Sequence, residues 1–252
     1  MVHFHNTLPA DMDIHPNHTG THTTTILGIF LLSWIIVNLS GCGGNDNSTG
    51  PGSLSPVTAP KVMFVNASPD APPVDLYIDS TRIFRDLSYG QNTPYLTLSA
   101  GFHALIVQLL DSTRVVYAGS APLDIGAIYT VFAADTFTHI TPIIMFDLFN
   151  QPPSGFAAVR LVNAAGGTPK VGVVTVLDSS SITGIGFSEY SSFVPFKSDS
   201  TVFQIRESGT QHVLATTAKQ NIESGKFYTL YLRGFAGGTG ADTLTVGVIV
   251  NR

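Results

Sequence analysis

Three aspartates within one short segment are the clearest candidates for an ion site. Asp70 lies in a proline-rich turn, and Asp75 and Asp79 lie on the strand expected to follow it. Calcium requires roughly six to eight oxygen ligands gathered in a compact loop, whereas these acids are spread along a turn and a strand. Because Asp75 and Asp79 alternate with Leu76 and Ile78, they point to the opposite face of that strand. We therefore predict a structural turn and a solvent-facing strand, with a weak ion site as the alternative.

Histidine and serine are the residues from which a hydrolase site could be assembled. Beyond residue 42 the histidines are His103, His139 and His212, and we expect His103 and His212 on strands. The pentapeptide at residues 186–190 carries Ser188 but lacks the closing glycine of a nucleophile elbow. No zinc-binding spacing such as HExxH or CxxC is present in the sequence. We predict no catalytic residue, no metal and no cofactor. Because residues distant in sequence can form a triad, an exported hydrolase with its site in one β-domain stays the alternative.

Two further patterns have a simpler structural interpretation. The glycine-rich segment 237–240 lacks the lysine of a phosphate-binding loop, and we interpret it as a hairpin turn. Several aromatic residues could line a face that binds a sugar or a peptide, but we expect most of them in the core. These residues are Tyr89, Tyr95, Phe187 and Tyr190.

The composition excludes two classes of partner and favours strands. Charged residues make up only 12% of the chain, the net charge is -5, and every lysine and arginine lies after position 60 without a basic run. Binding of nucleic acid and electrostatic binding of a membrane both need clustered positive charge. Long solvated helices need charged outer faces, so the low charge, with 24 glycines and 15 prolines, predicts short strands joined by tight turns.

The apolar segment at residues 26–37 has the length of the h-region of a signal peptide. A membrane-spanning helix needs about 20 apolar residues, so a permanent span is not expected. Leu39, Ser40, Gly41 and Cys42 then resemble the lipobox of bacterial lipoproteins, in which an aliphatic residue and two small residues precede the lipid-bearing cysteine. The resemblance implies cleavage between Gly41 and Cys42 and attachment of lipid, including acyl chains such as palmitate, to Cys42. This is the only cysteine, so no intramolecular disulfide competes for the thiol.

The residues before the apolar segment depart from a usual signal peptide. Residues 1–25 contain no lysine or arginine but five histidines: His3, His5, His15, His18 and His22. One interpretation is a metal-binding tract; the interpretation we favour is a start codon assigned too early. In either case residues 1–41 leave with the signal peptide. Residues 42–60, which are rich in glycine, serine and proline, then form a lipid-anchored flexible linker.

Past residue 60 the sequence repeats itself. Residues 64–67 (FVNA) match 161–164 (LVNA), and residues 126–130 (GAIYT) match 225–229 (GKFYT), so the copies are 97 to 99 residues apart. A repeat of this length corresponds to a whole domain. We place the domains at 61–150 and 156–252, with the boundary in the segment 152–155. Residues 181–186 are expected to form a short helical turn.

Alternating apolar residues predict strands throughout both copies. The expected strands are 62–65, 74–78, 95–98, 103–107, 129–132 and 142–146 in the first copy, and 159–162, 171–176, 193–196, 202–205, 228–232 and 244–250 in the second. Six or seven short strands in each copy predict an all-β protein with two tandem β-sandwich domains of immunoglobulin-like type.

The segment 65–79, which reads VNASPDAPPVDLYID, is the most distinctive part of the chain. It resembles the opening of the bacterial family catalogued as domain of unknown function 4397. The steps at 89–90, 98–101 and 126–130 fit the later part of that pattern. The resemblance is close over the first copy and weak over the second, where Ala165, Gly166 and Gly167 replace the Ser-Pro-Asp turn.

The resemblance implies an exported, often lipid-anchored protein with tandem domains, and it brings no established activity. We therefore expect a protein held in the cell envelope by the lipid on Cys42, at the outer membrane if the source is Gram-negative. Its expected role is non-enzymatic: binding, adhesion or structure, with an envelope glycan or protein as partner.

Overall fold

The computed structural model describes residues 58–175 and 181–252. The predicted signal peptide, its histidines, Cys42 and most of the predicted linker lie outside these residues. Within the described part, strands dominate, and the helical elements are two 3-10 turns, η1 (Phe137–His139) and η2 (Gly240–Asp242). Neither turn is long enough to cross a membrane, and the described residues contain no helix that is.

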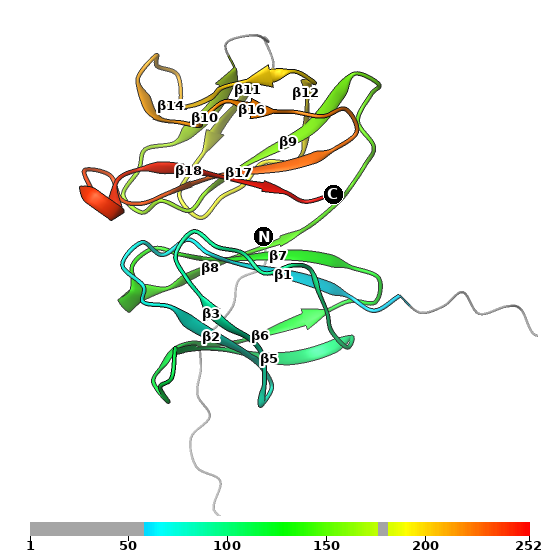
Figure 1. The fold of residues 1–252 in the computed structure, drawn as a ribbon, viewed down its shortest axis with the longest axis vertical. Helices are drawn as coiled ribbons and strands as arrows, with labels where there is room; N and C mark the ends of the chain where they lie inside the picture. Colours follow the sequence, from blue (N-terminus) through cyan, green and yellow to red (C-terminus); the bar gives the residue numbers. More distant parts are fainter. Residues whose placement is uncertain (1–57, 176–180) are drawn as a thin grey trace, which may run out of the picture. The chain divides into compact units, whose positions relative to one another are not determined.

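The first half of the described chain folds into two four-stranded sheets that lie face to face (Figure 1). One sheet has the order β4 (Leu96–Thr97), β1 (Lys61–Asn66), β7 (Ile128–Ala134) and β8 (Thr141–Phe146). The other has the order β3 (Thr81–Leu87), β2 (Val74–Ile78), β5 (Gly101–Leu109) and β6 (Val115–Leu123). We call this pair of sheets the first sandwich.

The second half repeats the arrangement, and we call it the second sandwich. One sheet has the order β12 (Val194–Lys197), β9 (Phe156–Asn163), β17 (Phe227–Arg233) and β18 (Thr245–Val250). The other has the order β11 (Ser181–Ile185), β10 (Val171–Thr175), β14 (Phe203–Glu207) and β15 (Val213–Thr216). A small ribbon of β13 (Ser200–Thr201) and β16 (Gln220–Asn221) is added.

The same strand order recurs because the same pairings recur. In the first sandwich β1 runs parallel to β7, with Met63 opposite Thr130. In the second β9 runs parallel to β17, with Arg160 opposite Thr229. The other pairings between strands are antiparallel. The prediction of an all-β protein built from β-sandwiches is confirmed; its immunoglobulin-like detail is not.

The central strands are continuous apolar runs because both of their faces are buried. In β1, Val62 and Phe64 point into the core of the first sandwich, whereas Met63 and Val65 point into a separate apolar cluster. That cluster also contains residues of the second sandwich, among them Tyr231. Successive residues of a strand point to opposite faces, so a strand between two cores shows no polar alternation. We call this shared cluster and its polar surroundings the junction.

Several sequence expectations are corrected by the described strands. The helical turn expected at 181–186 is wrong, because Ser181–Ile185 forms β11 and pairs with β10. Besides β11, five strands were not expected: β3, β6, β13, β15 and β16. Each carries few buried side chains, so the hydrophobic alternation that identifies a strand is weak. His212 precedes β15 instead of lying on a strand.

Candidate functional site

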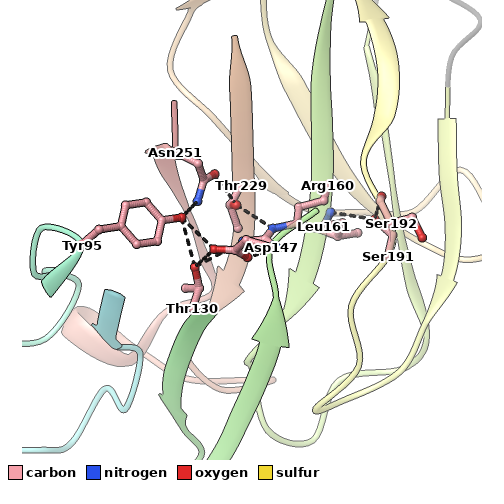
Figure 2. A network of polar contacts seen from close by, with 9 residues as sticks. All are labelled: Tyr95, Thr130, Asp147, Arg160, Leu161, Ser191, Ser192, Thr229 and Asn251. Atoms are coloured by element: carbon pink, nitrogen blue, oxygen red, sulfur yellow. Dashed lines mark hydrogen bonds and ion pairs between the residues drawn. The ribbon is translucent and has the colours of Figure 1, made fainter. Parts of the chain in front are cut away.

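A buried ion pair connects the two sandwiches. Asp147 directly follows β8, and Arg160 lies in the middle of β9. Nη1 of Arg160 lies 2.6 Å from Oδ1 of Asp147, and the two residues are 2% and 4% exposed (Figure 2). The guanidinium also lies 4.6 Å from the centre of the Phe193 ring. A buried pair of this kind is tolerated only where its remaining polar atoms are hydrogen-bonded.

A closed ring of hydrogen bonds supplies those partners. The Tyr95 hydroxyl donates to Asp147 at 2.7 Å and accepts from the Asn251 amide at 3.0 Å. Nε of Arg160 donates to the Thr229 hydroxyl at 2.8 Å, and that hydroxyl donates to Asn251 at 2.6 Å. Figure 2 shows this ring, which closes where Asn251 donates to Tyr95. Because each of the five residues is bonded to two others, the hydrogen bonds hold every side chain of the ring in one orientation.

The carboxylate of Asp147 is the centre of negative charge in this network. Its Oδ2 accepts from the hydroxyls of Tyr95 and Thr130, both at 2.7 Å. Burial raises the pKa of the Tyr95 phenol to about 12, and the charge of Asp147 adds to that shift. The phenol therefore remains a donor to the carboxylate at neutral pH.

The network is built from corresponding positions of the two sandwiches. Thr130 and Thr229 both follow a Gly-x-x-Tyr step, and each pairs with the central strand of its own sheet. Asp147 and Asn251 each follow the last strand of their sandwich. Their N–H groups donate to corresponding carbonyls, those of Ile128 and Phe227.

Two aromatic rings repeat this correspondence at the centre of the junction. Phe132 and Tyr231 occupy equivalent places in β7 and β17, and their ring centres are 5.2 Å apart. The equivalent of Arg160 in the first sandwich is Met63, as the strand registers require. The two sandwiches therefore meet through equivalent faces, and the ion pair makes that junction asymmetric.

A cleft opens beside the buried pair. Its volume is about 480 Å³, and Arg160 lies at its wall. Exposed apolar side chains of Phe146, Leu148 and Tyr190 line it together with the amides of Asn150 and Gln151. Arg160 is the charged residue of that lining, and its guanidinium is already paired with Asp147. The cleft is concave, aromatic and rich in neutral polar groups.

The segment that leads from β8 to β9 is anchored beside this cleft. Phe149 packs edge-on against Phe227 and lies 5.8 Å from the Phe193 ring, measured between ring centres. It also makes an edge contact with Tyr95, which belongs to the ring of hydrogen bonds around Asp147. The aromatic cluster thus packs the connecting segment against both sandwiches.

The predicted aspartates do not come together. Asp70 accepts the N–H of Phe137 at 2.7 Å, and Asp75 pairs with Arg82 at 3.2 Å. Asp79 pairs with His103 at 2.9 Å. Among the residues that the structure describes, no group of three metal-ligating side chains is assembled. The expectation that Asp75 faces solvent is wrong, because its side chain is buried against Arg82.

His103 has two polar neighbours that its position in the sequence did not reveal. Its Nδ1 lies 2.9 Å from Asp79, and its Nε2 lies 3.3 Å from the hydroxyl of Ser99. The backbone N–H of Ala104 donates to the other oxygen of Asp79. These bonds, that from His103 above all, lower the pKa of Asp79. Nε2 also lies 3.0 Å from the carbonyl oxygen of Ser99. Polar contacts on both nitrogens make the ring a clamp between the turn after β2 and the segment before β5.

The remaining candidates from the sequence lie on strands, in a loop, at the junction or at the cleft. His103 lies on β5 as expected, and the glycine-rich segment 237–240 lies in the loop joining the antiparallel strands β17 and β18. Tyr95 and Phe187 pack at the junction, and Tyr89 lies beneath the Arg233 guanidinium. The remaining aromatic candidate, Tyr190, is the exposed one and lines the cleft. Cys42 and Gly41 lie outside the described residues.

Asp147 and Arg160 were not recognised in the sequence. A signal for Arg160 existed, because an arginine interrupts the otherwise apolar run of β9, and a charge buried in a strand requires a partner. The sequence around Asp147 contains no pattern that identifies it as that partner. The pairing of the two depends on how the sandwiches meet.

Comparison with known proteins finds one family model that matches part of the chain. No curated protein matches the sequence. The resemblance expected from the segment 65–79 is confirmed over the first sandwich and the beginning of the second. Residues 60–174 of this chain match the family described as Domain of unknown function (DUF4397).

Proposed function

We propose that this protein is a lipid-anchored component of the bacterial cell envelope that binds an uncharged glycan, without chemical conversion, in the cleft beside Arg160. The observation that carries the proposal is the lining of that cleft: exposed aromatic and apolar side chains beside neutral amides, with its one charge already paired. Binding sites for small molecules combine an apolar wall with a few polar groups in this way.

The lining suits a sugar ring. The face of an aromatic ring carries negative potential, so Tyr190 and Phe146 attract the polarised C–H groups of a pyranose. Each amide side chain offers both donors and an acceptor, and Asn150 and Gln151 therefore match the hydroxyls of a sugar. An ion as ligand would lack a counter-charge, since Asp147 already neutralises Arg160.

The junction supports binding by holding the cleft in one shape. The ring of hydrogen bonds around Asp147 and the aromatic contacts of Phe149 hold the connecting segment in place without a ligand. A site that is already ordered loses less conformational entropy on binding. The repeated strand order supports the further proposal that both sandwiches are copies of one immunoglobulin-like domain, although the family match covers only residues 60–174.

The test is a glycan array followed by titration of the intact, detergent-purified protein. Tyr190→Ala and Asn150→Ala are expected to weaken binding about tenfold each, as loss of a central contact does. Val213→Ala, an exposed apolar residue in β15, serves as the matched control and leaves affinity unchanged. Failure of every neutral glycan to bind, or binding that neither cleft variant alters, would refute the proposal.

The anchor is the second part of the proposal, and the segment 39–42 supports it. We expect Cys42 to be acylated and Gly41 to be the last residue removed. Cys42→Ala should leave an unlipidated precursor that takes up no label from a fatty-acid analogue, whereas the parent protein is labelled. Equal labelling of the two would contradict the assignment. Placement in the outer membrane of a Gram-negative envelope follows from the same proposal.

A second candidate function, an exported hydrolase, is favoured by the neighbourhood of Asp79, His103 and Ser99, which have the chemical types of a catalytic triad. The short distance from Nε2 to the Ser99 carbonyl weighs against it, because a general base needs that nitrogen for the hydroxyl proton. A fluorophosphonate that labels the parent protein but not Ser99→Ala would establish the hydrolase. Absence of labelling at Ser99 would remove it.

A further inference from the structure

We infer that one end of the first sandwich rests on the lipid surface, with Phe102 and Ile125 in the interfacial layer of the bilayer. The inference depends on the lipid anchor proposed above and goes beyond it. An anchor alone holds the chain by one covalent attachment, whereas this contact also fixes the orientation of the folded part.

The turn that carries Ile125 lies beside the first described residues of the chain. The N–H of Gly126 donates to the carbonyl of Thr58 at 2.7 Å, and the N–H of Lys61 donates to Ala127 at 2.9 Å. Ile125 is 63% exposed at this place. The chain therefore enters the first sandwich next to an exposed aliphatic side chain.

Phe102 lies at the same end of the sandwich. It is the second residue of β5 and pairs with Pro122, three positions before Ile125. Phe102 is 82% exposed, the highest value among the large apolar residues of the described part. Exposed apolar side chains that gather at one end of a domain indicate an interaction surface.

The two carboxylates at this end are both hydrogen-bonded to neighbouring groups. Asp79 is held by His103 and by the N–H of Ala104. The carboxylate of Asp124 accepts the Tyr129 hydroxyl at 3.2 Å. Lys61 also lies at this end, as its bond to Ala127 shows, and its ammonium suits the phosphate of a headgroup.

The length of chain before the sandwich argues for lipid as the occupant of this surface. Residues 43–57 separate Cys42 from the described chain, and a glycine- and serine-rich segment of that length has a root-mean-square reach of roughly 20 Å. With lipid on Cys42, we expect the end bearing Thr58 to lie on average about that far from the headgroups. Apolar side chains held at a bilayer surface partition into the boundary between headgroups and acyl chains.

The experiment places one tryptophan at each end of the same hairpin. Val115 is exposed and lies at the far end of β6, where it pairs with Gln108. Phe102→Trp and Val115→Trp are each introduced into the full chain with Trp34→Phe, so that no other tryptophan is present even in precursor that keeps residues 1–41. Purified protein is reconstituted into phosphatidylcholine vesicles with and without brominated acyl chains.

Indole fluorescence then reports which end meets the lipid. We expect the emission of Phe102→Trp to move to shorter wavelength and to be quenched roughly twofold by brominated lipid, as interfacial insertion requires. Val115→Trp should keep its emission. An unquenched Phe102→Trp on vesicles that carry the protein overturns the inference, as does equal quenching at the two ends.

Failure of the anchor is distinguished by the state of Cys42. If mass spectrometry finds an unmodified thiol, the proposed lipidation is wrong. The thiol, being the only one in the chain, is then coupled to a maleimide phospholipid in the same vesicles. The quenching comparison decides the membrane contact in that case as well.

Discussion

Arg160 of the second sandwich donates to Asp147, which follows the last strand of the first, across 2.6 Å in a buried environment. The connecting segment and the first residues of β9 are all that separate the two in sequence, yet Asp147 follows a strand of one sheet and Arg160 lies in another. Met63 and Asn251 stand at the corresponding positions of the opposite sandwich. The pair therefore distinguishes the two halves of a junction that is otherwise built from equivalent faces.

Removing one partner of this pair should be far more costly than removing both. Arg160→Met leaves the carboxylate of Asp147 buried without its cation, and we expect the free energy of unfolding to fall by about 3–5 kcal/mol. Adding Asp147→Asn should restore much of that loss, because Met and Asn are the residues found at the equivalent positions. Denaturant titration of the single and double variants measures both effects.

An exposed ion pair in the same protein provides the control. Arg85 and Asp111 are 2.7 Å apart at the surface, and Arg85→Met is expected to cost less than about 1 kcal/mol. If Arg160→Met costs no more than Arg85→Met, or if the second substitution adds to the first loss, the account of the junction is wrong.

Tyr95 should make stability depend on alkaline pH. Its pKa is raised from 10.0 to about 12 in the folded protein, so above pH 10 the unfolded chain loses a phenolic proton that the folded protein retains. The contribution of Tyr95 is therefore complete below pH 10 and is lost as pH rises toward 12. Tyr95→Phe should show a shallower decline over that interval than the parent protein. Identical slopes in the two pH series would contradict this prediction.

The clamp around His103 should stabilise the first sandwich, and its removal should be felt at acid pH. Hydrogen bonds from His103 and Ala104 lower the pKa of Asp79, so its contribution is present above the unfolded value of 3.8 and is lost as pH falls below it. His103→Ala is expected to lower the melting temperature, and Asp79→Asn to flatten the acid limb of the stability curve. His212→Ala, whose ring is exposed near Glu207, should change neither.

The aromatic contact at the centre of the junction should stabilise both sandwiches together. Phe132 is fully buried and packs on Tyr231, so Phe132→Ala should cost about 3–5 kcal/mol through lost burial and the cavity left behind. Phe102→Ala removes the same ring from an exposed position and should have little effect on unfolding. Differential scanning calorimetry compares the two, and similar melting temperatures would argue against a shared core.

The strands could be predicted wherever apolar residues occupy most positions of a segment. The apolar segments of β1, β7, β9 and β17 are buried on both faces, and this burial requires apolar residues at successive positions. The edge strands β3 and β6 were missed because half of their side chains contact solvent. Their existence depends on a neighbouring strand to pair with, and such pairing has no local signature.

The sequence by itself determined the all-β class, the β-sandwich architecture and the resemblance that the family match supports over residues 60–174. Hydrophobic periodicity and turn residues act over a few positions, so they can be read from the chain. Only the tertiary structure decided that Arg160 meets Asp147, that Asp79 meets His103, and that Tyr190 alone of the four candidate aromatics is exposed. These contacts depend on which faces pack together, a choice made by the summed burial of many residues and not by any short segment.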